Sequence, residues 1–282
     1  MWAKKSGFPG ILFLIIFLFM GNLPFNAYAQ KPQGRKKNVV HHPVDTLKIE
    51  APKHFPRHDR PTKVKLPDST MVHAIKTLHL LQFKSPHDTA RYFVILFPGD
   101  GGWRDVMNTV TKSLNDQGIS VVGFNTVPYF RKKRNPREVA LDIQLVMDYY
   151  SRLWNKKSVV IGGYSFSAEV IPFAYNAMDQ AYRNKTLHLI LLAPSLLADF
   201  KIGTLFIYPT AKSTPLLPEL KKIDPGKMLI ICDGIKESLC PSLSGYSDLD
   251  IVHFACNHWF VGYRKEVALV ISERLETLKN SK

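Results

Sequence analysis

A serine lies at the centre of the segment best suited to chemistry, residues 163–167 (GYSFS). Small residues around a serine are typical of the nucleophile elbow, a sharp turn from a strand into a helix that exposes the hydroxyl above a sheet. Ser167 stands where the second glycine is usual, which is one small residue in place of another. An apolar run precedes Ser165 and a helical pattern follows it. We therefore interpret Ser165 as a nucleophile for acyl transfer rather than as a helix cap.

Such a serine needs a histidine base and an acid that orients the histidine, and after an elbow they follow in the order acid, then histidine. His258 lies just beyond the last predicted strand, and we prefer it to His253, which lies within that strand. Two acids follow the preceding strand. Asp233 touches the strand end, and Glu237 lies three residues past Gly234. We prefer Glu237 as the acid and keep Asp233 as the alternative.

The developing negative charge on an attacked carbonyl needs backbone donors, and a glycine-rich loop can supply them. Residues 97–103 (FPGDGGW) have three glycines in four positions after the first predicted core strand. We expect an oxyanion hole from the amides of Asp100, Gly101 and Phe166. A phosphate-binding loop is the rival interpretation, but the Gly-Lys-Ser/Thr ending is missing. No metal site and no cofactor are predicted, because the scattered histidines lack ligand spacing.

The elements that must hold these residues alternate from residue 90 onward. Apolar runs predict strands at 92–97, 119–124, 158–162, 187–192, 228–232 and 250–254, with a candidate edge strand at 78–83. Helical spacing predicts helices at 103–117, from Pro136, after Ser165 and at 264–278. This alternation implies a mostly parallel sheet with helices on both faces. With the elbow, it predicts an α/β-hydrolase fold over residues 76–282, with little or no lid.

The first 29 residues have the pattern of a secretory signal peptide. Lys4 and Lys5 precede an apolar run at residues 11–20, and small residues, Ala27 and Ala29, stand before the expected cleavage point. The apolar run is about half of the roughly 20 residues that a membrane span needs. We therefore predict cleavage and a periplasmic location.

Positive charge is concentrated behind this segment. The whole chain has a net charge of +15, and residues 31–65 alone hold ten Lys/Arg against three Asp/Glu. Prolines are frequent there and no apolar period is sustained, so we predict a flexible basic arm over residues 30–75. It is either a solvated linker or a contact with an anionic bilayer. Nucleic acid is not expected, because an exported chain without a binding motif offers no site for it.

The chain has three cysteines, so at least one thiol stays unpaired. Cys240 and Cys256 are candidates for a disulfide in an oxidising compartment, since both follow predicted strands near the proposed site. Sequence alone does not establish this pair.

Three segments resemble the bacterial virulence proteins VirJ and AcvB: residues 99–105 (GDGGWRD), 163–176 (GYSFSAEVIPFAYN) and 238–241 (SLCP). The resemblance covers roughly residues 90–280. The family usually has a His-His-Phe segment near its end, whereas this chain has residues 256–260 (CNHWF). The first family histidine falls on His258 and the second is Trp259. The family acid precedes its Ser-x-Cys-Pro segment, which implies Glu237, although glutamate is one methylene longer than aspartate.

AcvB-like members are similar to periplasmic hydrolases that remove the amino acid, typically lysine, from aminoacylated phosphatidylglycerol. The resemblance implies a phospholipid substrate and an aminoacyl-enzyme on Ser165. Glu169 and Asp100 are candidates to bind the substrate ammonium; the alternatives are a buried salt bridge for Glu169 and a turn-stabilising role for Asp100. A hydrolase of another ester, thioester or peptide stays open, because fold does not fix substrate. VirJ-like proteins are associated with secretion and virulence, so a partner of a secretion system is a further alternative.

Overall fold

The computed structural model describes residues 68–203, 213–235 and 238–279. The predicted signal peptide, residues 1–29, lies outside the described residues, and so does the predicted basic arm up to residue 67. Glu237, the preferred acid, also lies outside them.

Within the described residues, seven strands form one sheet in the order β1-β3-β2-β4-β5-β8-β9. These strands are β1 (Leu80–Phe83), β2 (Tyr92–Phe97), β3 (Val121–Phe124), β4 (Ser158–Tyr164), β5 (Thr186–Leu192), β8 (Met228–Cys232) and β9 (Asp250–His253). β1 is an antiparallel edge strand, and every other neighbouring pair is parallel. All the predicted strands are therefore present, including the candidate edge strand.

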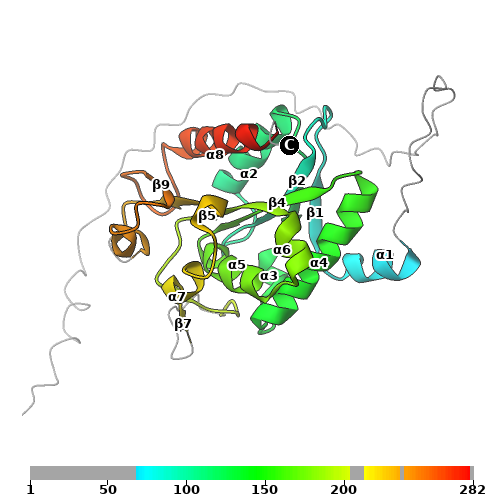
Figure 1. Ribbon diagram of the computed structural model, residues 1–282, viewed down its shortest axis with the longest axis horizontal. Coiled ribbons are helices and arrows are strands. Elements are labelled where there is room, and N and C mark those ends of the chain that lie inside the picture. Colours follow the sequence, from blue (N-terminus) through cyan, green and yellow to red (C-terminus); the bar gives the residue numbers. More distant parts are fainter. Residues whose placement is uncertain (1–67, 204–212, 236–237, 280–282) are drawn as a thin grey trace, which may run out of the picture. The chain divides into compact units, whose positions relative to one another are not determined.

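Helices cover both faces of the sheet (Figure 1). They are α1 (Ser69–Lys76), α2 (Asp105–Asp116), α3 (Thr126–Tyr129), α4 (Pro136–Leu153), α5 (Phe166–Ala177), α6 (Gln180–Lys185), α7 (Leu217–Leu220) and α8 (Arg264–Lys279). α2 and α8 pack together on one face, while α4 and α5 lie on the other. None of the helices in these described ranges is long and apolar enough to cross a membrane.

The apolar run of β2 shows why its residues form a central strand. All six side chains are buried. Phe93 and Ile95 belong to the core cluster that includes α4 and α5, whereas Tyr92 and Val94 belong to the cluster that includes α2 and α8. Successive side chains of a strand point to opposite faces, so a strand covered by helices on both faces must be apolar throughout.

The segment between β5 and β8 contains short elements in its described part. They are β6 (Leu197–Ala198), β7 (Thr214–Pro215), α7 and the 3-10 helix η1 (Pro225–Lys227). β6 and β7 pair as a small antiparallel ribbon. The described residues of this segment thus contain no long helix that would serve as a lid.

The folded part begins earlier than predicted. Helix α1 starts at Ser69, inside the range assigned to the basic arm, and the Asp68 side chain caps it by accepting a hydrogen bond from the Met71 amide at 2.8 Å. Ile75 at its end is buried in the core cluster of α4 and α5. The helix has only eight residues, little more than two turns, so its apolar residues form no sustained pattern in the sequence.

A disulfide joins Cys232, the last residue of β8, to Cys240, the first residue of the 3-10 helix η2 (Cys240–Leu243), with a Cα–Cα distance of 6.0 Å. Cys256 is free and partly buried. The predicted pair of Cys240 with Cys256 is therefore wrong. The chain leaving β8 turns back on itself within eight residues, which brings Cys240 beside Cys232 instead.

Replacing both bonded cysteines, Cys232→Ala with Cys240→Ala, should lower the free energy of unfolding by about 2–3 kcal/mol, because the unfolded chain gains freedom in the released loop. Urea denaturation measures this loss. Cys256→Ala is the matched control and should cost less than about 1 kcal/mol. Peptide mapping of the unreduced protein would contradict the assignment if it linked Cys256 to either of the other cysteines.

Candidate active site

The serine predicted as nucleophile lies in the turn from β4 into α5. Ser165 has φ 53° and ψ −124°, a backbone conformation with positive φ that residues other than glycine rarely adopt. Its amide donates to the Leu192 carbonyl at 2.8 Å, and its own carbonyl accepts from the Ala168 amide at 2.8 Å. A strained serine between a strand and a helix is the geometry of the nucleophile elbow.

Small residues on either side of Ser165 are required by the close approach of β4 and α5. A Cβ atom on Gly163 would lie 2.7 Å from the Ser167 carbonyl oxygen and 2.6 Å from Ile171 Cδ1. Ser167 is fully buried, and its hydroxyl donates to the Pro98 carbonyl at 2.5 Å. The serine in place of the usual glycine therefore ties the elbow to the glycine-rich loop that begins at Gly99.

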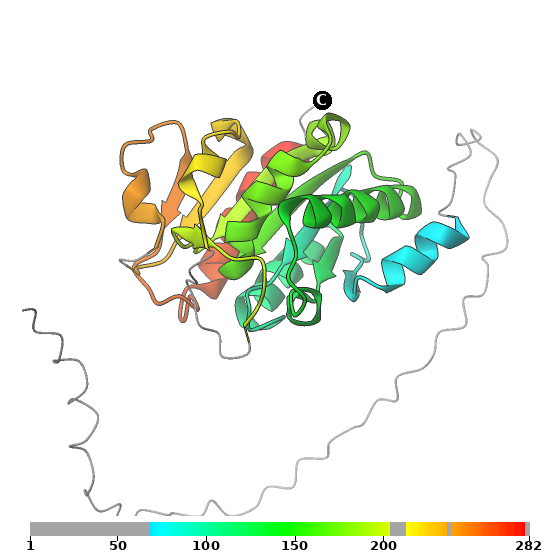
Figure 2. The same ribbon diagram turned by 90° about the horizontal axis from the view of Figure 1, so that it is seen from below.

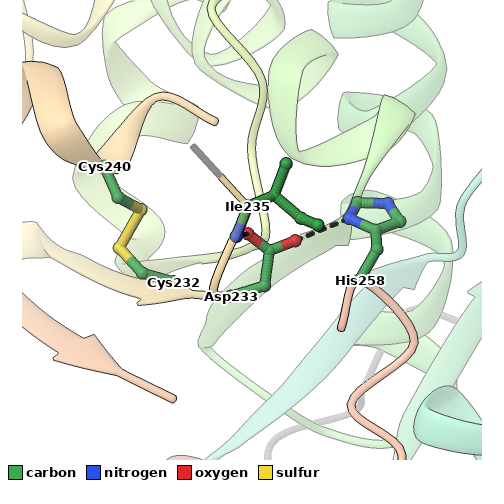
Figure 3. Close-up of a disulfide and its surroundings, with 5 residues drawn as sticks. All are labelled: Cys232, Asp233, Ile235, Cys240 and His258. Carbon is green, nitrogen blue, oxygen red and sulfur yellow. Dashed lines mark hydrogen bonds and ion pairs between the residues drawn. A yellow bond between two sulfur atoms is a disulfide. The ribbon is translucent and has the colours of Figure 1, made fainter. Parts of the chain in front are cut away.

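Ser165, His258 and Asp233 form a continuous chain of hydrogen bonds. Ser165 Oγ lies 2.7 Å from His258 Nε2, and His258 Nδ1 lies 2.7 Å from Asp233 Oδ2. Figure 3 shows the Asp233 carboxylate pointing at the imidazole. A carboxylate oxygen can only accept, so Nδ1 carries the proton and Nε2 is left to accept from the serine hydroxyl. The structure thus brings the predicted serine and histidine together.

The acid bound to His258 is Asp233, the alternative of the sequence analysis; Glu237, the preferred acid, lies outside the described residues. The Asp233 side chain is 1% exposed, and its second oxygen accepts the Ile235 amide at 3.2 Å (Figure 3). Asp233 reaches His258 because β8 and β9 are a parallel pair and stay together beyond their ends. There the Gly234 amide donates to the Cys256 carbonyl at 2.8 Å. The backbones after the two strands run side by side, so the residue directly at the end of β8 faces the histidine two residues past Cys256.

Tyr164 holds the histidine from the other side, a contact that the sequence did not reveal. Its hydroxyl donates to the His258 carbonyl at 2.8 Å, and the two rings stack with centroids 5.5 Å apart. Burial raises the pKa of Tyr164, so the hydroxyl keeps its proton and remains a donor. The aromatic residue within the elbow motif therefore fixes the backbone that carries the base.

The glycine-rich loop forms a tight turn beside the elbow. The Gly102 amide donates to the Gly99 carbonyl at 3.0 Å, and Gly102 has φ 77°. Thr126 Oγ1, at the start of α3, donates to the same Gly99 carbonyl at 2.8 Å. In the part of the chain that the structure describes, the amides of Asp100 and Gly101 donate to no protein acceptor. They remain candidates for the oxyanion hole, together with the amide of Phe166 at the start of α5.

A cleft of about 290 Å³ opens beside Ser165 and His258, lined by this loop, the start of α2, Tyr164 and Trp259. Two carboxylates line it, Asp100 and Asp105. Asp105 pairs with Arg264 at 3.0 Å, whereas Asp100 has no cationic partner among the described residues. Arg104 also lines the cleft, and its guanidinium donates to the Gly101 carbonyl at 2.9 Å rather than to Asp100.

Glu169 lies one turn into α5 and is 7% exposed. Its Oε1 accepts the Ser195 amide at 3.2 Å, and no described residue forms an ion pair with it. Among the described residues, Glu169 therefore does not form the buried salt bridge that was the alternative role. Burial, with smaller contributions from Asp199 and Asp100, raises the pKa of Glu169 to about 8. It is not among the residues that line the cleft.

The described residues contain no cluster of three His, Cys, Asp or Glu side chains arranged to hold a metal ion. The side chains that meet at Ser165 instead suit proton transfer and nucleophilic attack.

Glu169 should make stability fall as pH rises. The carboxyl of Glu169 is neutral in the folded protein below about pH 8 but ionises near pH 4.5 in the unfolded chain. Its contribution to the free energy of unfolding is therefore largest below about pH 4.5 and is lost as the pH rises to about 8. The glutamine of Glu169→Gln cannot ionise. In this variant the free energy of unfolding should therefore decrease between pH 6 and 8 by on the order of 2–3 kcal/mol less than in the parent. Thermal unfolding across this range measures it, and parallel pH profiles for both proteins would refute the assignment.

Comparison with known proteins places these features in a family. A profile described as "Bacterial virulence protein (VirJ)" matches residues 91–279, well over half of the chain. A search of curated protein sequences found no match.

Among solved structures, MenH from S. aureus is similar with a TM-score of 0.53 and 13% identity, covering 72% of this chain and 99% of its own. An α/β serine hydrolase without lid from Xanthomonas campestris has a TM-score of 0.47 and 15% identity, covering 72% and 95%. Est1E from Butyrivibrio proteoclasticus has a TM-score of 0.48 and 13% identity, covering 70% and 92%. At these identities, such likeness concerns the fold alone. The chain has the α/β-hydrolase fold and belongs to the VirJ family of bacterial virulence proteins.

Proposed function

We propose that this protein is a serine esterase that hydrolyses the aminoacyl ester of aminoacylated phosphatidylglycerol, for example lysyl-phosphatidylglycerol. The observation that carries the proposal is the hydrogen-bonded chain from Ser165 through His258 to the buried Asp233, beside a cleft lined by an unpaired carboxylate. The chain of hydrogen bonds supports nucleophilic attack on an acyl group. The carboxylate favours an acyl group that carries a positive charge.

In this mechanism, Ser165 Oγ attacks the ester carbonyl while His258 Nε2 takes the hydroxyl proton. Asp233 stabilises the imidazolium that forms and keeps the ring in the tautomer that accepts at Nε2. The carbonyl oxygen becomes an oxyanion and receives hydrogen bonds from the loop amides and from Phe166. Collapse of the tetrahedral intermediate expels the glycerol oxygen, which takes the proton from His258. Water, activated by the same base, then releases the amino acid from Ser165.

An aminoacyl group differs from a fatty acyl group by its ammonium, which needs an anionic partner. Asp100 lines the cleft and has no cationic partner among the described residues, which supports its carboxylate as the partner of that ammonium. The backbone amide of Asp100 is also a candidate donor to the oxyanion. The two functions do not conflict, because ammonium binding uses the carboxylate and oxyanion binding uses the amide. Glu169 is a weaker candidate, because it is buried outside the cleft lining and its raised pKa keeps it neutral near pH 7.

The proposal includes a periplasmic location, with residues 1–29 removed and the basic residues 31–65 beside an anionic membrane. The Cys232–Cys240 disulfide supports an oxidising compartment. Intact mass measurement of the protein recovered from the periplasmic fraction would contradict this location if the chain still began at Met1.

The description of the family as a virulence protein favours a second candidate, a partner protein of a secretion system that uses this fold for binding. The two candidates differ in whether Ser165 turns over a substrate.

Asp233→Asn should reduce kcat for ester hydrolysis by about 10³-fold or more, because the histidine loses the partner that fixes its tautomer. Glu237→Gln is the matched control and should change kcat by less than about threefold. Steady-state kinetics with a short-chain ester measures both variants. A loss in Glu237→Gln equal to that in Asp233→Asn would overturn the assignment of the acid.

The purified protein should release lysine from lysyl-phosphatidylglycerol, and Ser165→Ala should abolish this release. Asp100→Asn keeps the backbone amide but loses the carboxylate, so kcat/KM should fall by about tenfold more for the lysyl ester than for a neutral acyl ester. Quantifying free lysine and the alcohol product gives both values. Hydrolysis of simple esters without lysine release would refute this substrate, and no hydrolysis at all would favour the partner protein.

A further inference from the structure

Exposed apolar side chains lie in the loops at the carboxyl ends of the strands. Nine large apolar residues in the described ranges are exposed. Five of them lie in loops that follow the carboxyl ends of strands, where the active site is also placed: Leu196, Ile235, Trp259, Val261 and Tyr263. Trp259 is the most exposed at 64%, and it also lines the cleft. Apolar surface gathered at one place marks an interaction site more often than scattered residues do.

The loop that carries His258 holds Trp259, Val261 and Tyr263 exposed in a fixed turn. Phe260 is fully buried with φ 50°, and its amide donates to the Asn257 carbonyl at 2.9 Å. The Val261 amide donates to Asn257 Oδ1 at 3.2 Å, and the Tyr263 amide donates to the Phe260 carbonyl at 3.0 Å. Burying Phe260 in this conformation leaves its neighbours on either side in solvent. The same turn therefore positions the base and exposes an apolar edge.

A basic run lies on the same edge of the sheet. Arg131, Lys132 and Lys133 follow α3, are exposed, and form no ion pair with any described residue. Arg134 anchors the run by lying over the Tyr129 ring at 4.5 Å. In Figure 2 the green turn at α3 and the orange-red loop before α8 both lie along the lower edge of the folded part.

Exposed aromatic and aliphatic residues that share one edge of the folded part with basic residues suit the surface of an anionic bilayer. Trp and Tyr favour the level of the lipid headgroups, and Lys and Arg are attracted to the negative surface. Residues 66–282 alone still carry a net charge of +6, from 26 Lys/Arg against 20 Asp/Glu, which agrees with a negatively charged partner.

We propose that the docking face, defined as Arg131, Lys132, Lys133, Trp259 and Val261, binds an anionic phospholipid bilayer so that the cleft opens onto the lipid headgroups. The inference rests on the proposed function for the lipid nature of the substrate. Because Trp259 belongs to both the docking face and the cleft, its insertion at the headgroup level brings Ser165 to the depth of a headgroup ester. The docking face acts in addition to the basic arm and belongs to the folded part of the chain.

Vesicle sedimentation of the full mature chain, made inactive by Ser165→Ala, tests the docking face. Removing its basic residues with Arg131→Gln, Lys132→Gln and Lys133→Gln should weaken binding to phosphatidylglycerol vesicles at least tenfold. Trp259→Ala with Val261→Ser should weaken it by a similar factor. The matched controls are Lys84→Gln, Lys157→Gln and Lys185→Gln for charge, and Leu141→Ala with Leu269→Ala for apolar area; both should bind within twofold of the parent. The arm is present in every variant, so it does not explain a difference between them.

Tryptophan emission gives a second readout that needs no destabilising change. Phosphatidylglycerol vesicles should shift the emission of the parent protein to shorter wavelength, and Trp259→Phe should abolish the shift. Phosphatidylcholine vesicles should give weaker binding and a smaller shift.

The docking face is refuted if its variants sediment like the parent, if the control variants lose as much binding, or if the shift survives in Trp259→Phe. The esterase assays are independent of this result. Lysine release without dependence on the docking face would overturn the inference alone, while face-dependent binding without lysine release would overturn the proposed substrate alone.

Discussion

The close approach of β4 and α5 at Gly163 sets the position of the reactive serine, and the rest of the site is arranged around it. No room exists there for a side chain, so the chain must turn within Ser165, which adopts a left-handed conformation. Such a conformation in a residue other than glycine costs on the order of 1–3 kcal/mol and persists where its surroundings enforce it. Here the Leu192 carbonyl holds the turn from β5, and Ser167 bonds to Pro98. The strain is thus supported by the sheet on one side and by the glycine-rich loop on the other.

Three carboxyl groups near this serine differ in what surrounds them, and the difference separates their roles. Asp233 is buried but accepts hydrogen bonds from His258 and the Ile235 amide, so it can orient and stabilise the base. Glu169 is buried with Ser195 as its hydrogen-bond partner, and burial raises its pKa so that it is held neutral. Asp100 lines the cleft, where a substrate can reach it. Burial and hydrogen bonding, rather than residue type, decide which acid serves the chemistry.

The parallel sheet explains why catalysis and the docking face share one edge. Every parallel strand delivers its following loop to the same side, so the loops after β2, β3, β4, β8 and β9 meet there. These five loops carry, in the same order, the glycine-rich loop, the basic run after α3, the elbow, Asp233 and the turn of Phe260. Since Phe260 is anchored in the core between His258 and the exposed Val261, movement of the apolar edge is limited by the same packing that fixes the base.

The sequence by itself determined the features that depend on neighbours along the chain. Apolar runs gave β2, β4 and β8, and Pro136 marked the first residue of α4, because strand and helix periods are local. The elbow pattern identified Ser165, and the position after the last strand identified His258. Only the tertiary structure showed that Asp233 contacts His258, that Cys240 pairs with Cys232 rather than Cys256, and that Glu169 has no ion-pair partner among the described residues. The contact of Asp233 with His258 depends on the parallel pairing of β8 with β9, which no local pattern encodes. The disulfide closes over only eight residues, but which two of the three cysteines meet depends on how the chain folds back after β8.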